Sequence, residues 1–223
     1  MKGDVLEKIL TFIIILVGWV FSLCLHEFSH AVVAYYGGDT SVKDKGYLTF
    51  NPLKYTHPVY SLLLPLIFLI MGGIGLPGGA VYIETWRLRS KYWESTVALA
   101  GPFSNLVLAF ILGAVLQFAP VTGGGIWPGL GFLALLQISA VVLNLIPVPP
   151  FDGYGTLVPF LDRDLRTKVT RYSVYITLLV FFVLWYVPFV NDLFWKIVIW
   201  IGQLINLPFD LVWQGFNLFR FWK

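Results

Sequence analysis

Long apolar blocks constrain this chain more than any other feature of its sequence. Residues 97–119 and 129–146 carry no charge, and a third apolar run begins near Ile9. A membrane-spanning helix needs about 20 mostly apolar residues in a row. Charged residues make up only 12% of the 223-residue chain, about half the share that is typical of soluble domains. The sequence therefore predicts an all-α polytopic membrane protein with about five to six transmembrane helices.

The apolar blocks also predict how the membrane helices are distributed. Helices are expected over the ranges 6–36, 97–119, 129–146, 172–190 and 194–205. The first three belong to a membrane core over residues 1–160, and residues 161–223 supply C-terminal transmembrane helices and an amphipathic tail. Residues 39–58 are polar and rich in turn-forming residues, which predicts a loop on the aqueous side.

The segment 59–83 differs from the other apolar blocks. Its apolar part, 59–71, is only 13 residues long and contains Pro65, whereas a full crossing needs about 17–25 residues. A glycine-rich stretch and a strand-like stretch follow. Irregular backbone at membrane depth is tolerated only against protein or a water-filled cavity. We therefore expect a re-entrant helix and strand that line a site, and a plain loop is the alternative.

Two histidines and a glutamate lie inside the first apolar run, where ionisable groups are costly. His26 and His30 are four residues apart, so on a helix they occupy the same face. Glu27 follows His26 directly. Two imidazoles at this spacing can hold one divalent metal, and the neighbouring carboxylate can take a proton from a metal-bound water. The sequence thus predicts a metal site with Glu27 as its general base.

A catalytic zinc site needs a third protein ligand and an open position for water. The candidates are His57, Glu84 and Asp152. His57 lies in a polar loop, and Glu84 ends the strand-like stretch. Asp152 follows a proline-rich run at a predicted broken helix end, where a carboxylate near lipid needs a cation partner. Asp152 is therefore the predicted third ligand.

Three motifs in this order resemble the signature motifs of the site-2 protease family, which are intramembrane zinc metalloproteases. They are His26-Glu27-Phe28-Ser29-His30, the segment Gly101-Pro102-Phe103-Ser104-Asn105, and the run from Asn144 through Pro147, Pro149 and Pro150 to Asp152-Gly153. The resemblance covers about residues 9–160. It implies one catalytic Zn²⁺ bound by His26, His30 and Asp152, with Glu27 as general base and Asn144 near the oxyanion.

The resemblance also implies the partners of the chain. Substrates of such enzymes are single transmembrane helices cut within the bilayer, in regulated intramembrane proteolysis. The chain resembles a compact member without a soluble regulatory domain, so a regulatory membrane partner is expected. The net charge of +3 is small, which argues against a nucleic-acid partner.

A helical substrate hides its carbonyl groups in hydrogen bonds, so it must unwind before hydrolysis. An exposed edge strand can hold the unwound chain by strand addition. Residues 76–83 are the predicted edge, because glycine allows close approach of another backbone. The expected contacts with the substrate strand are Pro77, Gly78, Gly79 and Ala80.

The distribution of basic residues predicts the orientation in the membrane. If the segment 59–83 is re-entrant, only Lys2, Lys8 and Lys196 of the 15 lysines and arginines lie on one side. The positive-inside rule then places the active site toward the cytoplasm of a prokaryotic plasma membrane. A full crossing would separate His26 from Asp152. The first apolar run is expected to stay as a transmembrane helix.

Two other classes of protein also place metal-binding groups in membranes. A metal-ion transporter would need polar residues spaced along a path, and the sequence shows one cluster. A membrane scaffold with structural zinc would usually need four protein ligands, often cysteines, whereas this chain has only Cys24. Both remain alternatives to the protease.

Overall fold

The computed structural model describes residues 2–55, 81–120 and 124–220, and every regular element in these ranges is helical. The α-helices are α1 (Lys2–Gly37), α2 (Ser41–Asp44), α4 (Lys91–Leu116), α5 (Trp127–Asn144), α6 (Asp152–Leu157), α7 (Arg163–Arg171), α8 (Ser173–Tyr186), α9 (Pro188–Leu204) and α10 (Phe209–Phe219). Short 3-10 turns are η1 (Pro52–Lys54), η3 (Thr85–Arg87) and η4 (Val158–Phe160). The predicted all-helical class therefore holds for the described part of the chain.

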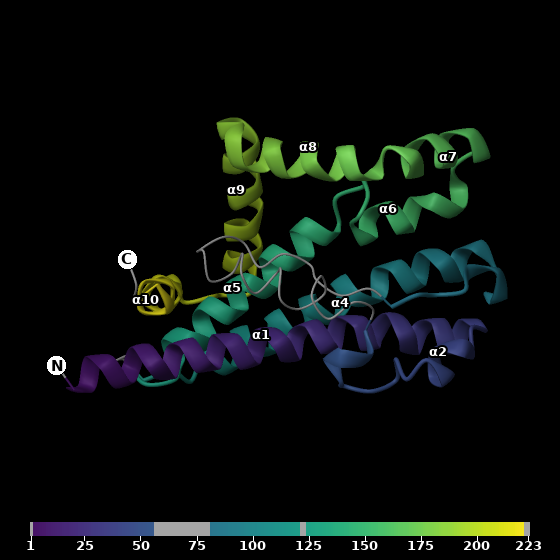
Figure 1. Ribbon diagram of the computed structural model, residues 1–223. Coiled ribbons are helices and arrows are strands. Elements are labelled where there is room, and N and C mark those ends of the chain that lie inside the picture. Colours follow the sequence, from purple (N-terminus) through teal and green to yellow (C-terminus); the bar gives the residue numbers. More distant parts are fainter. Residues whose placement is uncertain (1, 56–80, 121–123, 221–223) are drawn as a thin grey trace.

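Helix α1 runs the length of the molecule (Figure 1). Its 36 residues correspond to about 54 Å at 1.5 Å per residue. It ends at a glycine pair, because Gly38 adopts a positive φ of 121° that other residues rarely take. The N–H groups of Gly38 and Asp39 then bond back to the carbonyls of Tyr35 and Ala34, at 3.2 and 3.0 Å. The glycines therefore fix where the helix stops.

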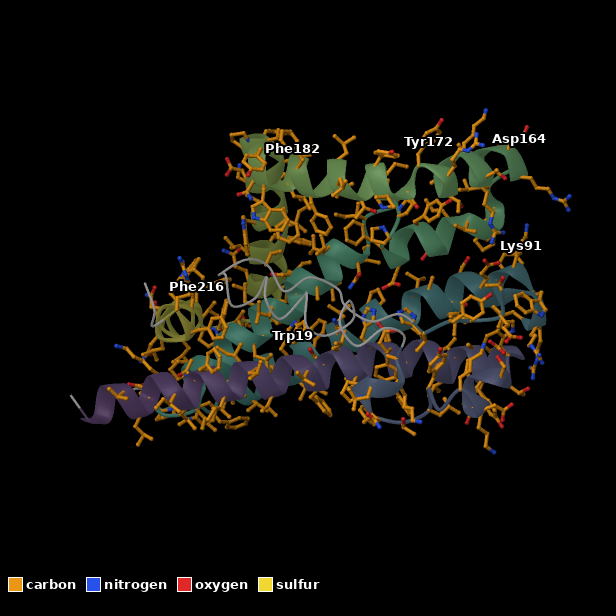
Figure 2. All side chains as sticks on the ribbon, viewed as in Figure 1. Trp19, Lys91, Asp164, Tyr172, Phe182 and Phe216 are labelled. Atoms are coloured by element: carbon orange, nitrogen blue, oxygen red, sulfur yellow. The ribbon has the colours of Figure 1, made fainter. Side chains whose placement is uncertain are left out.

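The core lies where α1, α4 and α5 meet, and α10 packs on α5 and also contacts α1. Trp19 of α1 lies in this core with Leu133 and Leu136 of α5 (Figure 2). A Cβ atom on Gly18 would come within 2.4 Å of Leu133, so the missing side chain lets α5 pack closely on α1. This packing brings α4 and α5 against the face of α1 that carries the histidines.

Three described helical segments are long and apolar enough to span a membrane: Val5–Gly37, Lys91–Leu116 and Trp127–Asn144. Helices α7 and α8 form a fourth candidate only as one span bent by 67°. Large apolar side chains such as Val17, Phe110 and Phe182 are exposed on the surface, as expected of helices that contact lipid. The chain is therefore a membrane protein.

The C-terminal helices are shorter than the predicted span count requires. Helix α8 has 14 residues and α9 has 17, about 21 and 26 Å against a hydrocarbon core of about 30 Å. The predicted helix at 172–190 ends at Tyr186, because Pro188 occupies the first turn of α9. Five to six spans, the re-entrant element and the division at residue 160 stay predictions.

The loop after α1 does not simply extend into solvent, as its polar composition suggested. Phe50 stacks on Phe28 and Phe21 of α1, with ring centroids 4.7 and 5.8 Å away. The Tyr55 hydroxyl lies between the carbonyl oxygens of Thr49, the nearer one, and Cys24, which is 3.3 Å away, and Tyr55 is 1% exposed. These aromatic residues bring the chain back from the end of α1 to its middle.

Candidate metal centre

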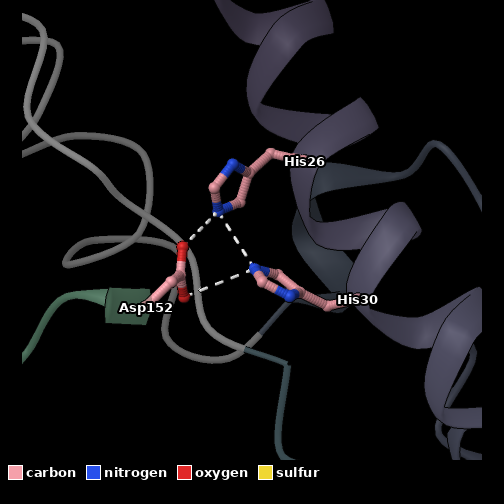
Figure 3. A group of neighbouring side chains, drawn as sticks. All are labelled: His26, His30 and Asp152. Atoms are coloured by element: carbon pink, nitrogen blue, oxygen red, sulfur yellow. Dashed lines mark hydrogen bonds and ion pairs between the residues drawn. The ribbon is translucent and has the colours of Figure 1, made fainter. Parts of the chain in front are cut away.

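His26 and His30 project from one face of α1 into the interior of the bundle, and both are buried. They lie one helical turn apart, with ring centroids separated by 4.7 Å. Their Nε2 atoms are 3.0 Å apart (Figure 3). The helix therefore directs two ring nitrogens toward one point.

The other ring nitrogen of His30 determines which tautomer faces that point. His30 Nδ1 lies 2.6 Å from the backbone carbonyl oxygen of Val97 in α4. A carbonyl can only accept a hydrogen bond, so Nδ1 carries the proton and Nε2 keeps its lone pair. Histidines that bind metals commonly donate their second N–H in this way.

Asp152 begins α6 and supplies an oxygen to the same point from a part of the chain that is distant in sequence. Its Oδ2 lies 3.1 Å from His26 Nε2, and its Oδ1 lies 3.5 Å from His30 Nε2 (Figure 3). A Cβ on the next residue, Gly153, would lie 2.3 Å from the Leu145 carbonyl oxygen. The tight turn that carries Asp152 toward α1 therefore requires this glycine.

The three side chains fit a zinc ion by the chemistry of their donor set. One nitrogen from each histidine and one carboxylate oxygen lie within 4.8 Å of one another, and this is the one such cluster in the ranges the structure describes. Asp152 Oδ2 is buried and makes no well-directed hydrogen bond there. Two nitrogens and one oxygen form the three-ligand set of catalytic zinc sites, and a bound cation would satisfy the carboxylate.

Gly101 of α4 makes room for the cluster. A Cβ at this position would lie 2.3 Å from His30 Nε2 and 2.5 Å from His26 Nε2. Any larger side chain would therefore occupy the position of the two ligand atoms. The first residue of the second motif thus keeps the space beside the histidines open.

Glu27 lines the same cavity as the two histidines and Asp152, which encloses about 400 Å³. The Glu27 side chain is buried, and its Oε2 accepts a hydrogen bond of 3.1 Å from the Val81 N–H. This bond fixes one carboxylate oxygen. The segment that begins at Val81 therefore orients the predicted general base.

The two other candidates for the third ligand lie elsewhere. Glu84 pairs with Lys45 at 2.9 Å and with Arg87, outside the cluster. Hydrogen bonds from Lys45 and Arg87 lower the pKa of Glu84 to about 2. Its charge is therefore already compensated by two cations. His57 lies outside the described residues.

The remaining predicted site residues separate into two groups. Asn144 is buried at the end of α5 and lines the cavity. Pro77, Gly78, Gly79 and Ala80 lie outside the described residues, as does most of the predicted re-entrant element. Val81 and Ile83, which follow it, line the cavity. The end of the predicted edge segment thus reaches the site.

Sequence reasoning did not single out Val97, Val81 or Gln137. Val97 and Val81 act through backbone groups, which no side-chain pattern reveals. Gln137, which also lines the cavity, left a signal, because it is a lone amide in the otherwise apolar middle of α5.

Comparison with known proteins shows relatives along most of the chain. It is 44% identical to the candidate zinc metalloprotease Rip2 of Mycolicibacterium smegmatis over 213 aligned residues. The alignment covers 95% of this chain and 82% of the relative. The Rip2 protein of Mycobacterium tuberculosis H37Rv is 42% identical over 214 residues, with the same coverage. The candidate zinc metalloprotease YwhC of Bacillus subtilis 168 is 32% identical over 188 residues, or 79% of this chain and 81% of the relative. No family model and no solved structure matches the chain.

Proposed function

The chain belongs to the site-2-protease-like family of zinc metalloproteases, and we propose that it hydrolyses peptide bonds within or near transmembrane segments of membrane proteins. The observation that carries this proposal is one cavity, between helices long enough to span a membrane, that contains His26, Glu27, His30 and Asp152. Water is scarce in a bilayer, so hydrolysis there needs a site that holds and activates it. This cavity combines metal-binding groups with a carboxylate base.

In the proposed mechanism, His26, His30 and Asp152 hold the zinc ion. When bound, zinc lowers the pKa of water and polarises the scissile carbonyl. Glu27 takes a proton from the attacking water and returns it to the leaving amine. The Val81 N–H binds Glu27 Oε2 and so fixes the orientation of the carboxylate that takes the proton. Asn144 donates from its side-chain amide to the developing oxyanion.

The proposal includes a re-entrant path for residues 59–83. Tyr55 contacts α1 at Cys24, and Val81 contacts it at Glu27. The two flanks of the intervening segment thus contact α1 within one helical turn, which supports a chain that leaves and returns at one depth. We propose that Pro77 to Ala80 form the edge that holds the unwound substrate. Cysteines at Lys45 and Arg89, in a Cys24→Ser background, should then both be labelled from the cytoplasmic side. Labelling from opposite sides would refute this path.

We also propose that the chain lies in the plasma membrane of a prokaryote as a multi-pass protein of five to six spans, with the site toward the cytoplasm. The clustering of basic residues in loops supports this orientation. A transmembrane protein substrate and a regulatory membrane partner complete the proposal.

The test is cleavage of a transmembrane peptide by the purified, zinc-loaded protein in detergent. Glu27→Gln should abolish cleavage and keep the zinc, because glutamine fills the same space and cannot accept the proton. Glu84→Gln, which changes a carboxylate outside the cluster, is the matched control and should still cleave. Undiminished cleavage by zinc-loaded Glu27→Gln would refute the role of this residue.

A further inference from the structure

The active-site cavity continues past the histidines to a wall of buried amides. Gln137 of α5 and Asn105 of α4 line the same 400 Å³ space as His26 and Asp152. Gln137 is 1% exposed and Asn105 is 5% exposed. Asn105 lies one turn after Gly101, on the face of α4 that touches the histidines. This wall is therefore part of the reaction cavity.

The hydrogen bonds of Gln137 determine which of its atoms is left free. The Ser22 hydroxyl donates its single proton to the Trp19 carbonyl at 2.8 Å. Ser22 Oγ can therefore only accept from Gln137, whose Nε2 lies 3.1 Å away. The amide nitrogen is held by Ser22, and the carbonyl oxygen of Gln137 is the atom without a partner.

Asn105, which also lines the cavity, carries a second unsatisfied acceptor. Its Oδ1 is buried and has no hydrogen-bond partner in the described structure. Buried polar groups in proteins nearly always have partners. Two unpaired carbonyl oxygens among the residues of one cavity therefore indicate a ligand with hydrogen-bond donors. Water and the polar side chain of a bound peptide both have this chemistry.

We propose that Gln137 and Asn105 form a subsite that accepts hydrogen bonds from a hydroxyl or amide side chain of the substrate, next to the scissile bond. The proposal rests on the proposed protease function and names a feature of its substrates. A substrate residue that enters this end of the cavity displaces any water there. An apolar side chain would leave both oxygens unpaired. A serine or threonine hydroxyl can donate its single proton to one of them, and an asparagine amide has two N–H groups and can donate to both. Sites built in this way discriminate strongly against analogues that lack the donor.

The experiment measures peptide binding, so that it does not depend on cleavage. Transmembrane peptides that differ only by threonine or valine, placed in turn at each position along the transmembrane segment, are titrated into zinc-loaded Glu27→Gln protein in detergent. Threonine and valine have nearly the same shape and differ in one hydroxyl. At one position, the threonine peptide should bind at least about tenfold more tightly. In the double variant with Gln137→Met, that ratio should fall to about one.

Controls distinguish loss of the subsite from misfolding and from loss of bound water. Gln203→Met changes an exposed glutamine on α9 and should keep the tenfold ratio. If Gln137→Met does not fold, Asn105→Leu provides the same test. Equal weakening of both peptides would mean that the oxygens hold only water, and would overturn the proposal. Equal binding of threonine and valine peptides at every position would overturn it as well. Loss of cleavage by the wild type, with the binding preference intact, would count against the proposed protease function and not against the subsite.

Discussion

Two buried polar regions of this molecule differ in whether their hydrogen-bond acceptors have partners. Asp39, just after α1, is 0% exposed, and its carboxylate accepts from Ser41 N at 3.1 Å, Ser41 Oγ at 2.6 Å and Glu84 N at 2.8 Å. Asn105 and Gln137 in the cavity each keep a buried oxygen without a partner. The first region is satisfied by the protein itself, and the second is not.

This difference separates residues that hold the chain from residues that await a ligand. Asp39 ties the end of α1 to Glu84, three residues beyond the Val81 N–H that binds Glu27. The Gly37 carbonyl reinforces this connection by accepting from Arg89 N at 2.9 Å. We call residues 81–89 the strap. The Asp39 carboxylate is filled by the strap and by Ser41, so its expected role is to position the strap. The side-chain carbonyl oxygens of Asn105 and Gln137 have no such partners and are free to bind a ligand.

The largest effect is expected where the cavity has no spare room. Gly101→Ala places a methyl group where the ligand nitrogens lie, 2.3 Å from His30 Nε2. Zinc affinity should fall by at least about tenfold, as it does when groups beside metal ligands are disturbed. Zinc competition with a chelator measures this. Gly124→Ala, whose Cβ would meet only Glu7 Oε1 at 3.6 Å, should bind zinc normally. Equal affinities in the two variants would show that the cluster is not confined as described.

The next largest effect is expected at Asp39, whose acceptors all have partners. Asp39→Ala leaves the N–H groups of Glu84 and Ser41 without their acceptor, which should lower the unfolding free energy by about 1–3 kcal/mol. Hydrogen exchange at the Val81 and Glu84 amides should accelerate, because the strap loses its anchor. Asp44→Ala, on the exposed side of α2, is the control. Unchanged exchange at Val81 would mean that Asp39 does not position the strap.

A substitution in the cavity should change the stability less than Asp39→Ala does. Gln137→Met removes an unsatisfied oxygen and one bond to Ser22, so the unfolding free energy should change by no more than about 1 kcal/mol. Thermal unfolding of the two variants in the same detergent gives the contrast. A loss for Gln137→Met as large as that for Asp39→Ala would erase the distinction between the two regions.

The smallest effect is expected at Glu84, whose side chain pairs with Lys45 and Arg87 near the surface. Its pKa is lowered to about 2 in the folded protein, below the ordinary value of 4.5. The paired carboxylate therefore contributes stability above about pH 4.5. That contribution declines as the pH falls from 4.5 toward 2. The difference in melting temperature between wild type and Glu84→Gln should be constant near neutral pH and shrink over this window. A difference that grows on acidification would have the wrong sign.

The sequence predicted the cluster of His26, His30 and Asp152 better than its surroundings. The spacing of the histidines is local to one helix, and an acidic residue at a proline-broken helix end needs a cation. The pairing of Glu84 with Lys45, 39 positions away, could not be predicted, because neither residue lies in a motif or in a costly environment that calls for a partner. Glu84 therefore remained a candidate ligand until the structure placed it with two cations.

The orientation of α5 explains why Gln137 was missed. This helix is apolar over most of its surface and 78% of it is buried, so its hydrophobic pattern does not show which face meets the cavity. The helix break at Pro188 was missed for a different reason. Proline carries a local signal, yet the apolar composition on both sides favoured one continuous run at 172–190.

The central claim is that His26, His30 and Asp152 together hold the zinc ion. Its most direct test is the zinc content of purified protein, measured by elemental analysis, for the wild type, Asp152→Ala and the exposed control Asp164→Ala. Two imidazoles alone rarely hold a catalytic zinc. The wild type and the control should therefore carry about one zinc per chain, and Asp152→Ala should lose most of it. Stoichiometric zinc in a folded Asp152→Ala protein would contradict the assignment and return Glu84 or His57 to the list of candidate ligands.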